Sequence, residues 1–326
     1  MRTRGRLINE LVGTFLTANA DWLLLFSLGL LVELVLGGKS ILGRLPSTDS
    51  LISHPFAFIK KRLDRAHRSP GALKLRGFLT LIVLAPITVY LGALLNTLMM
   101  FEPFGPPLAA LLLARSINLR GVWEETLETA RTQNAGMHAA LRTGNAQMVL
   151  NVARDWGGNM ILFTLGGFAL LLPFRLLSVA LDGVNPTSAA WPKASFTRPF
   201  ALLYDLMALP GALLTSLCFA LAPILVPGTK LGAARGPIAE STREGGLRGI
   251  LSRVIPLSIV AYGLGYAFRF DGSGAGKAKR WLGPKDGRAR LEGSDTRQTT
   301  RFLLASGAWM VLMMIMLAML ILLAKN

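Results

Sequence analysis

Cysteine, histidine and acidic residues are scarce in this chain, and each scarcity excludes a class of chemistry. The single cysteine, Cys218, can form neither an internal disulfide nor a cysteine-ligated zinc site, and it lies in an apolar run where we expect it to pack. The three histidines, His54, His67 and His138, lack the spacing of metal ligands. Segment 272–277 (GSGAGK) has neither the following Ser or Thr nor the preceding strand of a phosphate-binding loop, so we interpret it as a flexible basic loop.

Long apolar runs are plentiful instead, and they predict a membrane protein. Hydrophobic residues make up 52% of the 326 residues, and the mean hydropathy is +0.48. We expect a single integral-membrane domain over 1–326, of all-α class: a polytopic helical bundle with about six transmembrane helices. A further apolar run, 251–268, contains Arg253 and several glycines, and we expect it to be a re-entrant or amphipathic helix. The predicted spans lie near 22–37, 78–100, 103–118, 157–181, 206–227 and 302–324.

Positive charge is abundant, and its placement predicts topology rather than nucleic-acid binding. The chain has 35 Lys and Arg against 18 Asp and Glu. Segments 39–77, 115–156 and 228–301 hold 28 of the 35 basic residues, which predicts that they are cytoplasmic loops. We expect these loops to be partly helical and the membrane to be the inner membrane of a bacterium. If instead 251–268 crosses the membrane and 103–118 does not, the two sides of the membrane hold 20 and 14 basic residues. This asymmetry is much smaller, so we prefer the arrangement in which 103–118 crosses. The expected partner is the lipid bilayer, without nucleic acid, and homo-oligomerisation stays open.

Segment 157–181 organises the rest of the chain. It contains glycine pairs that allow close helix packing, Pro173, and a single charge, Arg175. Glu33, Asp182 and Asp205 are the other ionisable residues at or near membrane depth, where charges are costly. Either Arg175 pairs with a carboxylate or extends its charged end to the membrane surface, and Asp182 lies at the interface, or these residues line a substrate cavity.

An ordered set of short motifs resembles the CobD/CbiB family, the membrane adenosylcobinamide-phosphate synthases of cobalamin biosynthesis. Together the motifs cover about residues 22–320. The matching pieces are 53–61 (SHPFAFIKK), Asn151 with Asp155, 163–167 (FTLGG), Phe174 with Arg175, Leu181 with Asp182, 209–214 (LPGALL), 281–283 (WLG) and 293–302 (GSDTRQTTRF).

The resemblance implies a ligase that uses ATP and Mg²⁺. A corrinoid, adenosylcobyric acid, would be joined through a propionate carboxylate to aminopropanol or its phosphate, giving adenosylcobinamide or its phosphate. The implied catalytic residues are His54, Asn151 and Asp155, and Asp155 is the one candidate metal ligand. The implied substrate-binding residues are Arg175, Asp182, Arg288 and Arg290, although the basic loops also serve as topology determinants.

Several acids of the family pattern are absent, which keeps two other classes of function open. Leu150 stands where the pattern has glutamate, Gly38 and Lys39 stand where it has Asp-Pro, and Asp205 is out of register with its paired aspartates. The chain is therefore either a synthase with relocated acids or an AmpE-like, non-catalytic sensor or assembly protein. A transporter is the weaker alternative, because no paired broken helices are evident in two halves.

The predicted site needs a break in segment 157–181. We expect His54, Asn151, Asp155, Arg175 and Asp182 to converge on one cavity. In a straight helix, however, Arg175 would lie about 30 Å from Asp155. The chain must therefore turn back at 166–167 or at Pro173. Without a break, only His54, Asn151 and Asp155 are candidates.

Overall fold

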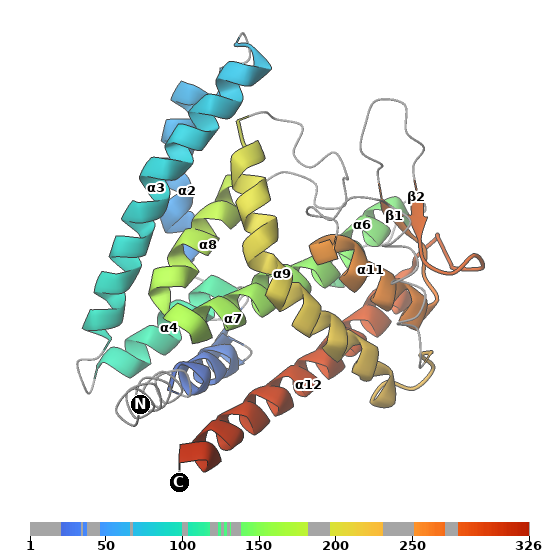
Figure 1. Cartoon of the computed structure of the whole chain (residues 1–326). Coiled ribbons are helices and arrows are strands. Elements are labelled where there is room, and N and C mark those ends of the chain that lie inside the picture. Colours follow the sequence, from blue (N-terminus) through green and yellow to red (C-terminus); the bar gives the residue numbers. More distant parts are fainter. Residues whose placement is uncertain are drawn as a thin grey trace, which may run out of the picture.

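The computed structural model is built of helices, with one short antiparallel pair of strands (Figure 1). It describes residues 21–33, 35–37, 46–65, 68–99, 104–117, 123–124, 127–128, 131, 138–181, 196–230, 251–270 and 280–325. After a first helix at 21–33, the elements are α2 (Thr48–Leu63), α3 (Pro70–Leu98), α4 (Gly105–Ile117), α6 (His138–Leu150), the π-helix η2 (Asn151–Trp156), α7 (Gly157–Gly166), α8 (Phe168–Ala180), α9 (Arg198–Leu221), the 3-10 helix η3 (Ala222–Ile224), α11 (Leu251–Leu264), β1 (Phe268–Phe270), β2 (Arg280–Leu282) and α12 (Gly293–Lys325). The all-α class predicted from the sequence is confirmed.

Three helices are long and apolar enough to cross a membrane. They are α3, α9 together with η3, and α12, with mean hydropathies of 2.3, 1.8 and 2.2 over their most apolar windows. Only 17% of that window in α3 is buried against the rest of the protein. Its exposed surface is formed by large apolar side chains such as Phe78, Ile82 and Tyr90. Such a surface is compatible with contact to lipid.

Six full-length spans were predicted, but within the described residues only these three have the length. Helix α4, in the predicted span 103–118, has 13 residues and reaches about 20 Å, less than the roughly 30 Å of hydrocarbon. The predicted span at 22–37 includes the helix at 21–33. Helix α11, in the apolar run 251–268, has 14 residues and is also shorter than a full span. It is almost entirely buried within the protein.

Segment 157–181, expected as one span, is divided between two helices. Helices α6, η2 and α7 follow one another without interruption from His138 to Gly166, so the helix already begins within the predicted loop 115–156. Helix α6 continues through Gly144 without a break. The actual break is at Gly167, where φ is 58° and the chain turns into α8 (Figure 1). This conformation favours glycine because a Cβ would be strained there.

The side chain of Asn96, on α3, satisfies the backbone groups that this break leaves free. Its Nδ2 donates to the carbonyl of Gly166 at 3.0 Å, and its Oδ1 accepts from the N–H of Phe168 at 2.8 Å. In an apolar bundle, unpaired backbone groups are costly. The break is therefore specified jointly by Gly167 and by a residue 71 positions earlier.

Replacing Gly167 with alanine is expected to destabilise the protein by about 1–3 kcal/mol. The added Cβ would take an unfavourable φ and would lie 2.5 Å from Oδ1 of Asn96. The thermal midpoint of the detergent-solubilised protein should fall, and Asn96→Leu should lower it as well, because Leu cannot pair with the freed groups. Gly71→Ala, where a Cβ meets nothing within 4 Å, is the control. Equal midpoints for Gly167→Ala and the control would contradict this account.

Helices α7 and α9 cross backbone to backbone at a pair of glycines. A Cβ on Gly157 would lie 2.6 Å from the carbonyl oxygen of Gly211, and a Cβ on Gly211 would collide with the backbone of Gly157 and Gly158. Small residues at a crossing let membrane helices approach closely. This crossing holds η2 beside the first half of α9, and these two segments carry the buried charged residues Arg154 and Asp205.

The segment that precedes α12, expected to be loop within 228–301, is ordered into strands and a helix cap. Strand β1 pairs with β2, and Tyr266 bridges to Arg288. The Oδ2 of Asp295 accepts from the N–H of Glu292 at 2.9 Å, in the manner of a capping box. Burial, and after it the carboxylate of Asp295, raise the pKa of Tyr266 well above its usual range, so its hydroxyl remains a hydrogen-bond donor.

Candidate functional site

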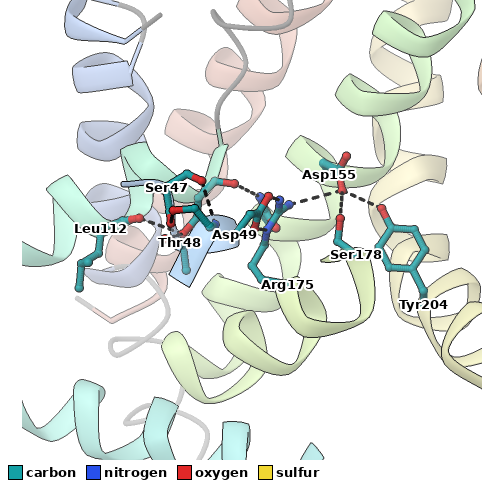
Figure 2. Close-up of polar contacts among 11 residues, drawn as sticks. Ser47, Thr48, Asp49, Leu112, Asp155, Arg175, Ser178 and Tyr204 are labelled. Atoms are coloured by element: carbon teal, nitrogen blue, oxygen red, sulfur yellow. Dashed lines mark hydrogen bonds and ion pairs between the residues drawn. The ribbon is translucent and has the colours of Figure 1, made fainter. Parts of the chain in front are cut away.

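Arg175 lies between two aspartates that come from other helices (Figure 2). Its Nε donates to Oδ1 of Asp49 at 2.8 Å and its Nη2 pairs with Oδ2 of the same carboxylate, a two-pronged contact. Its Nη1 lies 3.4 Å from Oδ1 of Asp155. The Arg175 side chain is 5% exposed, whereas those of Asp49 and Asp155 are 30% and 23% exposed. The two carboxylates therefore form the accessible edge of the cluster.

Asp155 is the acceptor for two further donors. The hydroxyl of Tyr204 donates to its Oδ1 at 2.7 Å, and the hydroxyl of Ser178 donates to the same atom at 3.3 Å. Ser178 lies on α8, almost one turn after Arg175, and Tyr204 lies on α9. Asp155 thus joins η2 to α8 and to α9 (Figure 2).

Asp49 reaches Arg175 because the start of α2 is fixed in place. Ser47 caps the helix by accepting from the N–H of Ser50 at 3.1 Å, which leaves Asp49 in the first turn, where a carboxylate is favourable. The hydroxyl of Thr48 forms a 2.9 Å hydrogen bond with that of Ser116 on α4. The polar stretch before α2 is thereby anchored to the interior of the bundle.

A second, closed cluster lies beside the first. Oδ1 of Asp205 lies 3.2 Å from Nη2 of Arg154, and Oδ2 lies 3.4 Å from Nη2 of Arg253. The hydroxyl of Ser252 donates to Oδ1 at 3.3 Å. All three charged side chains are 4–6% exposed. Among the described residues, one carboxylate therefore contacts two guanidinium groups in the interior.

The two clusters are joined through neighbouring residues of η2 and α9. Arg154 and Asp155 are consecutive, as are Tyr204 and Asp205, and the guanidinium of Arg154 lies 4.4 Å from the centre of the Tyr204 ring. Phe174 stacks on the same ring with a centroid distance of 4.9 Å. Both pairs meet where η2 widens the helix into a π turn, a feature that is frequent at functional sites.

The structure brings some of the predicted residues together and leaves others apart. Asp155 and Arg175 are in contact because the chain turns back at Gly167. Asn151 opens the same π-helix and is half-buried. His54 is exposed on α2, and its Nδ1 is hydrogen-bonded to the carbonyl of Ser50 in its own helix at 2.7 Å. Asp182 lies outside the described residues.

Arg288 and Arg290 lie in the segment before α12 rather than in this cluster. Nη2 of Arg288 pairs with Oδ1 of Asp295 at 2.8 Å, and its guanidinium lies 5.5 Å from the centre of the Tyr266 ring. These contacts tie Arg288 to the start of α12, although its side chain is 59% exposed. Arg290 is exposed.

Sequence reasoning missed the acid that binds Arg175 most closely. Asp49 stands in a polar stretch (PSTDS) with no pattern that marks it, and only the tertiary structure shows its role. Arg154, Tyr204 and Arg253 have charged or phenolic side chains at the ends of apolar runs, and this position is the signal in the sequence that could have identified them. The sequence indicates that Asp205 is an ionisable residue near membrane depth, but no pattern identifies Arg154 and Arg253 as its partners.

The two accessible carboxylates are the only described groups of the cluster that suit a magnesium ion. In the described part of the chain, no three His, Cys, Asp or Glu side chains gather as a metal site. Magnesium in nucleotide-using enzymes is commonly held by one or two carboxylates together with substrate phosphates. Asp49 and Asp155 are carboxylates of this kind, and Arg175 contacts both of them. Mg²⁺ held by one of them would neutralise phosphate charge.

Compared with models of known protein families, with curated proteins and with solved structures, the chain matches none.

Proposed function

We propose that this protein is a membrane ligase of cobalamin biosynthesis, similar to the CobD/CbiB family. It joins a propionate carboxylate of adenosylcobyric acid to the amine of aminopropanol or of its phosphate. ATP is cleaved to ADP and phosphate, the carboxylate oxygen leaves with the phosphate, and the amine nitrogen forms the amide. The product is adenosylcobinamide or its phosphate.

The observation that carries this proposal is the contact between Asp155 and Arg175. Both belong to the central block of motifs on which the resemblance rests, and they are 20 residues apart in the chain. Their meeting depends on the break at Gly167, within the motif FTLGG. A structural role alone does not require that motif residues from separate segments share one partly exposed polar cluster.

The roles of the side chains follow from their charges. Arg175 offers the planar pair of donors that suits a carboxylate or a phosphate, so an anionic substrate group can compete with Asp49 for it. Asp155 is oriented by Tyr204 and Ser178, and its carboxylate can bind the ammonium of the amine donor or accept its proton. Mg²⁺ beside the phosphates of ATP would be held by Asp49, because a carboxylate bound to the metal could not also take the proton of the amine.

We also place the protein in the cytoplasmic membrane of a bacterium, with segments 39–77, 115–156 and 228–301 on the cytoplasmic side. The concentration of 28 of the 35 basic residues in these segments supports this orientation. The substrates and ATP would then reach the cluster from the cytoplasm.

Complementation of a synthase-deficient, cobinamide-requiring bacterial strain tests the function. The native protein should restore growth without cobinamide, and Asp155→Asn should abolish growth, because the amide keeps the hydrogen bonds of the site but loses the charge. Asp286→Asn, at an exposed aspartate outside the cluster, should grow like the native protein. Immunoblots of membranes should show equal amounts of all three proteins.

A non-catalytic role on the same fold is the second candidate. It is favoured because all three aspartates of the two clusters are paired with arginines, as in a purely structural network. Failure of the native protein to complement, despite normal amounts in the membrane, would support this role over the ligase.

A further inference from the structure

We propose that the basic end of the α2–α3 hairpin binds anionic phospholipid headgroups. The surface is made of seven basic side chains at the end of α2, in the turn, and at the start of α3. We call it the hairpin patch, and it consists of Lys60, Lys61, Arg62, Arg65, Arg68, Lys74 and Arg76. The proposal concerns a lipid and does not depend on the proposed ligase activity.

The hairpin patch is strongly charged and open. Lys61, Arg62, Arg65, Arg68 and Lys74 are all exposed, and Asp64 is the only acid between positions 60 and 76. Within the described part of the chain, none of the seven side chains forms an ion pair. Arg62 instead lies over the ring of Phe58, with its guanidinium carbon 4.6 Å from the ring centre. Arg76, which is half-buried, donates from Nη1 to the carbonyl of Leu63 at 3.5 Å, so the five exposed side chains are the ones open to an external anion.

The position of the hairpin patch places it at the level of lipid headgroups. Exposed apolar side chains begin on α3 at Leu75 and Phe78 and continue along the helix. Pro70, the first residue of α3, therefore lies about 12 Å from Phe78 at 1.5 Å per residue, and the turn comes directly before it. If α3 crosses the bilayer, the patch is at the edge of the hydrocarbon. Clusters of four to eight basic residues directly beside a membrane helix are typical of binding to anionic lipids.

Helix α2 links this surface to the candidate site. One side of α2 is packed inward, where the ring of Phe56 lies 5.5 Å from that of Phe200. The other side exposes Leu51 and Phe58, and one turn further along Lys61 and Arg62. Apolar and basic side chains on one exposed side suit the boundary between headgroups and acyl chains.

Native mass spectrometry of the full-length protein tests the proposal. The protein is released from mixed phosphatidylglycerol–phosphatidylcholine nanodiscs, and the lipids that it retains are counted. The native protein should retain phosphatidylglycerol over phosphatidylcholine, and the preference should shrink as NaCl rises from about 0.05 M to about 0.5 M, because salt screens surface charge. In the variant Lys61→Gln/Arg62→Gln/Arg65→Gln/Arg68→Gln the preference should fall more than about tenfold.

Two further variants guard against trivial results. Lys285→Gln/Arg290→Gln/Arg297→Gln/Arg301→Gln removes the same charge from exposed positions around the start of α12 and should keep the preference. Arg62→Lys/Arg65→Lys/Arg68→Lys keeps the charge and should keep it as well, which matters if the glutamine variant fails to fold. Equal retention of the two lipids by the native protein, or an equal loss in the α12 variant, would overturn the proposal. Binding of added RNA at the patch in preference to phosphatidylglycerol would overturn it too.

Discussion

Replacing Asp205 with leucine is expected to remove most of the folded protein from the membrane. The change leaves the guanidinium groups of Arg154 and Arg253 buried and adjacent, without the carboxylate that compensates both. Breaking a buried ion pair from one side costs about 3–5 kcal/mol, a large share of a typical net stability of about 5–15 kcal/mol. Size-exclusion chromatography of a fluorescent fusion in mild detergent should show loss of the monodisperse peak.

A triple variant separates this electrostatic cause from a simple loss of shape. In Asp205→Leu/Arg154→Met/Arg253→Met no charge of the closed cluster remains, so we expect much of the folded peak to return. Asp286→Asn, at an exposed aspartate, is the control for the loss of one acid. A single Asp205→Leu variant that melts like the native protein would show that the cluster carries little of the stability.

The triple variant, if it folds, also shows whether the closed cluster is needed only for stability or for activity as well. The open cluster of Asp49, Arg175 and Asp155 does not include the three replaced side chains, although Arg154 packs on Tyr204. If the triple variant folds and still complements, the closed cluster is structural. If it folds and does not complement, the closed cluster positions Tyr204 and Asp155 for the reaction.

Replacing Gly211 with valine is expected to be similarly damaging, for a steric reason. The new side chain would meet the backbone of Gly157 and Gly158 on α7, which cannot move aside as a flexible side chain can. Overpacking typically costs about 1–3 kcal/mol, and contact with backbone on both sides favours the upper end. The separation of α7 from α9 would also draw Tyr204 and Asp205 away from η2, so both clusters should be disturbed.

Thermal melting of the fluorescent fusion measures this effect. Gly71→Val is the matched control, because a Cβ at Gly71, in the first turn of α3, has nothing within 4 Å. We expect a clear fall in the melting midpoint for Gly211→Val and little change for Gly71→Val. Equal midpoints would mean that the two helices can separate without loss and that their close crossing is not required.

The sequence by itself determined the helical class of the protein and some of the places where charge is buried. Runs of about twenty apolar residues require helices whose backbone groups are paired internally, so α3, α9 and α12 follow directly from hydropathy. Arg175, Asp205 and Arg253 interrupt apolar runs, and a lone charge there must find a partner. Helix geometry also showed that Asp155 and Arg175 could meet only if the chain broke at 166–167 or at Pro173, but it did not determine whether a break exists.

Only the tertiary structure decided which charges pair and where the helices begin and end. Asp49 binds Arg175 across 126 residues of chain, and Asn96 on α3 completes the break at Gly167. Neither contact leaves a local pattern, because both depend on how separate helices pack. The division of 157–181 into α7 and α8 has the same origin: hydropathy measures how apolar a segment is, whereas its path depends on one glycine dihedral and on a partner from another helix.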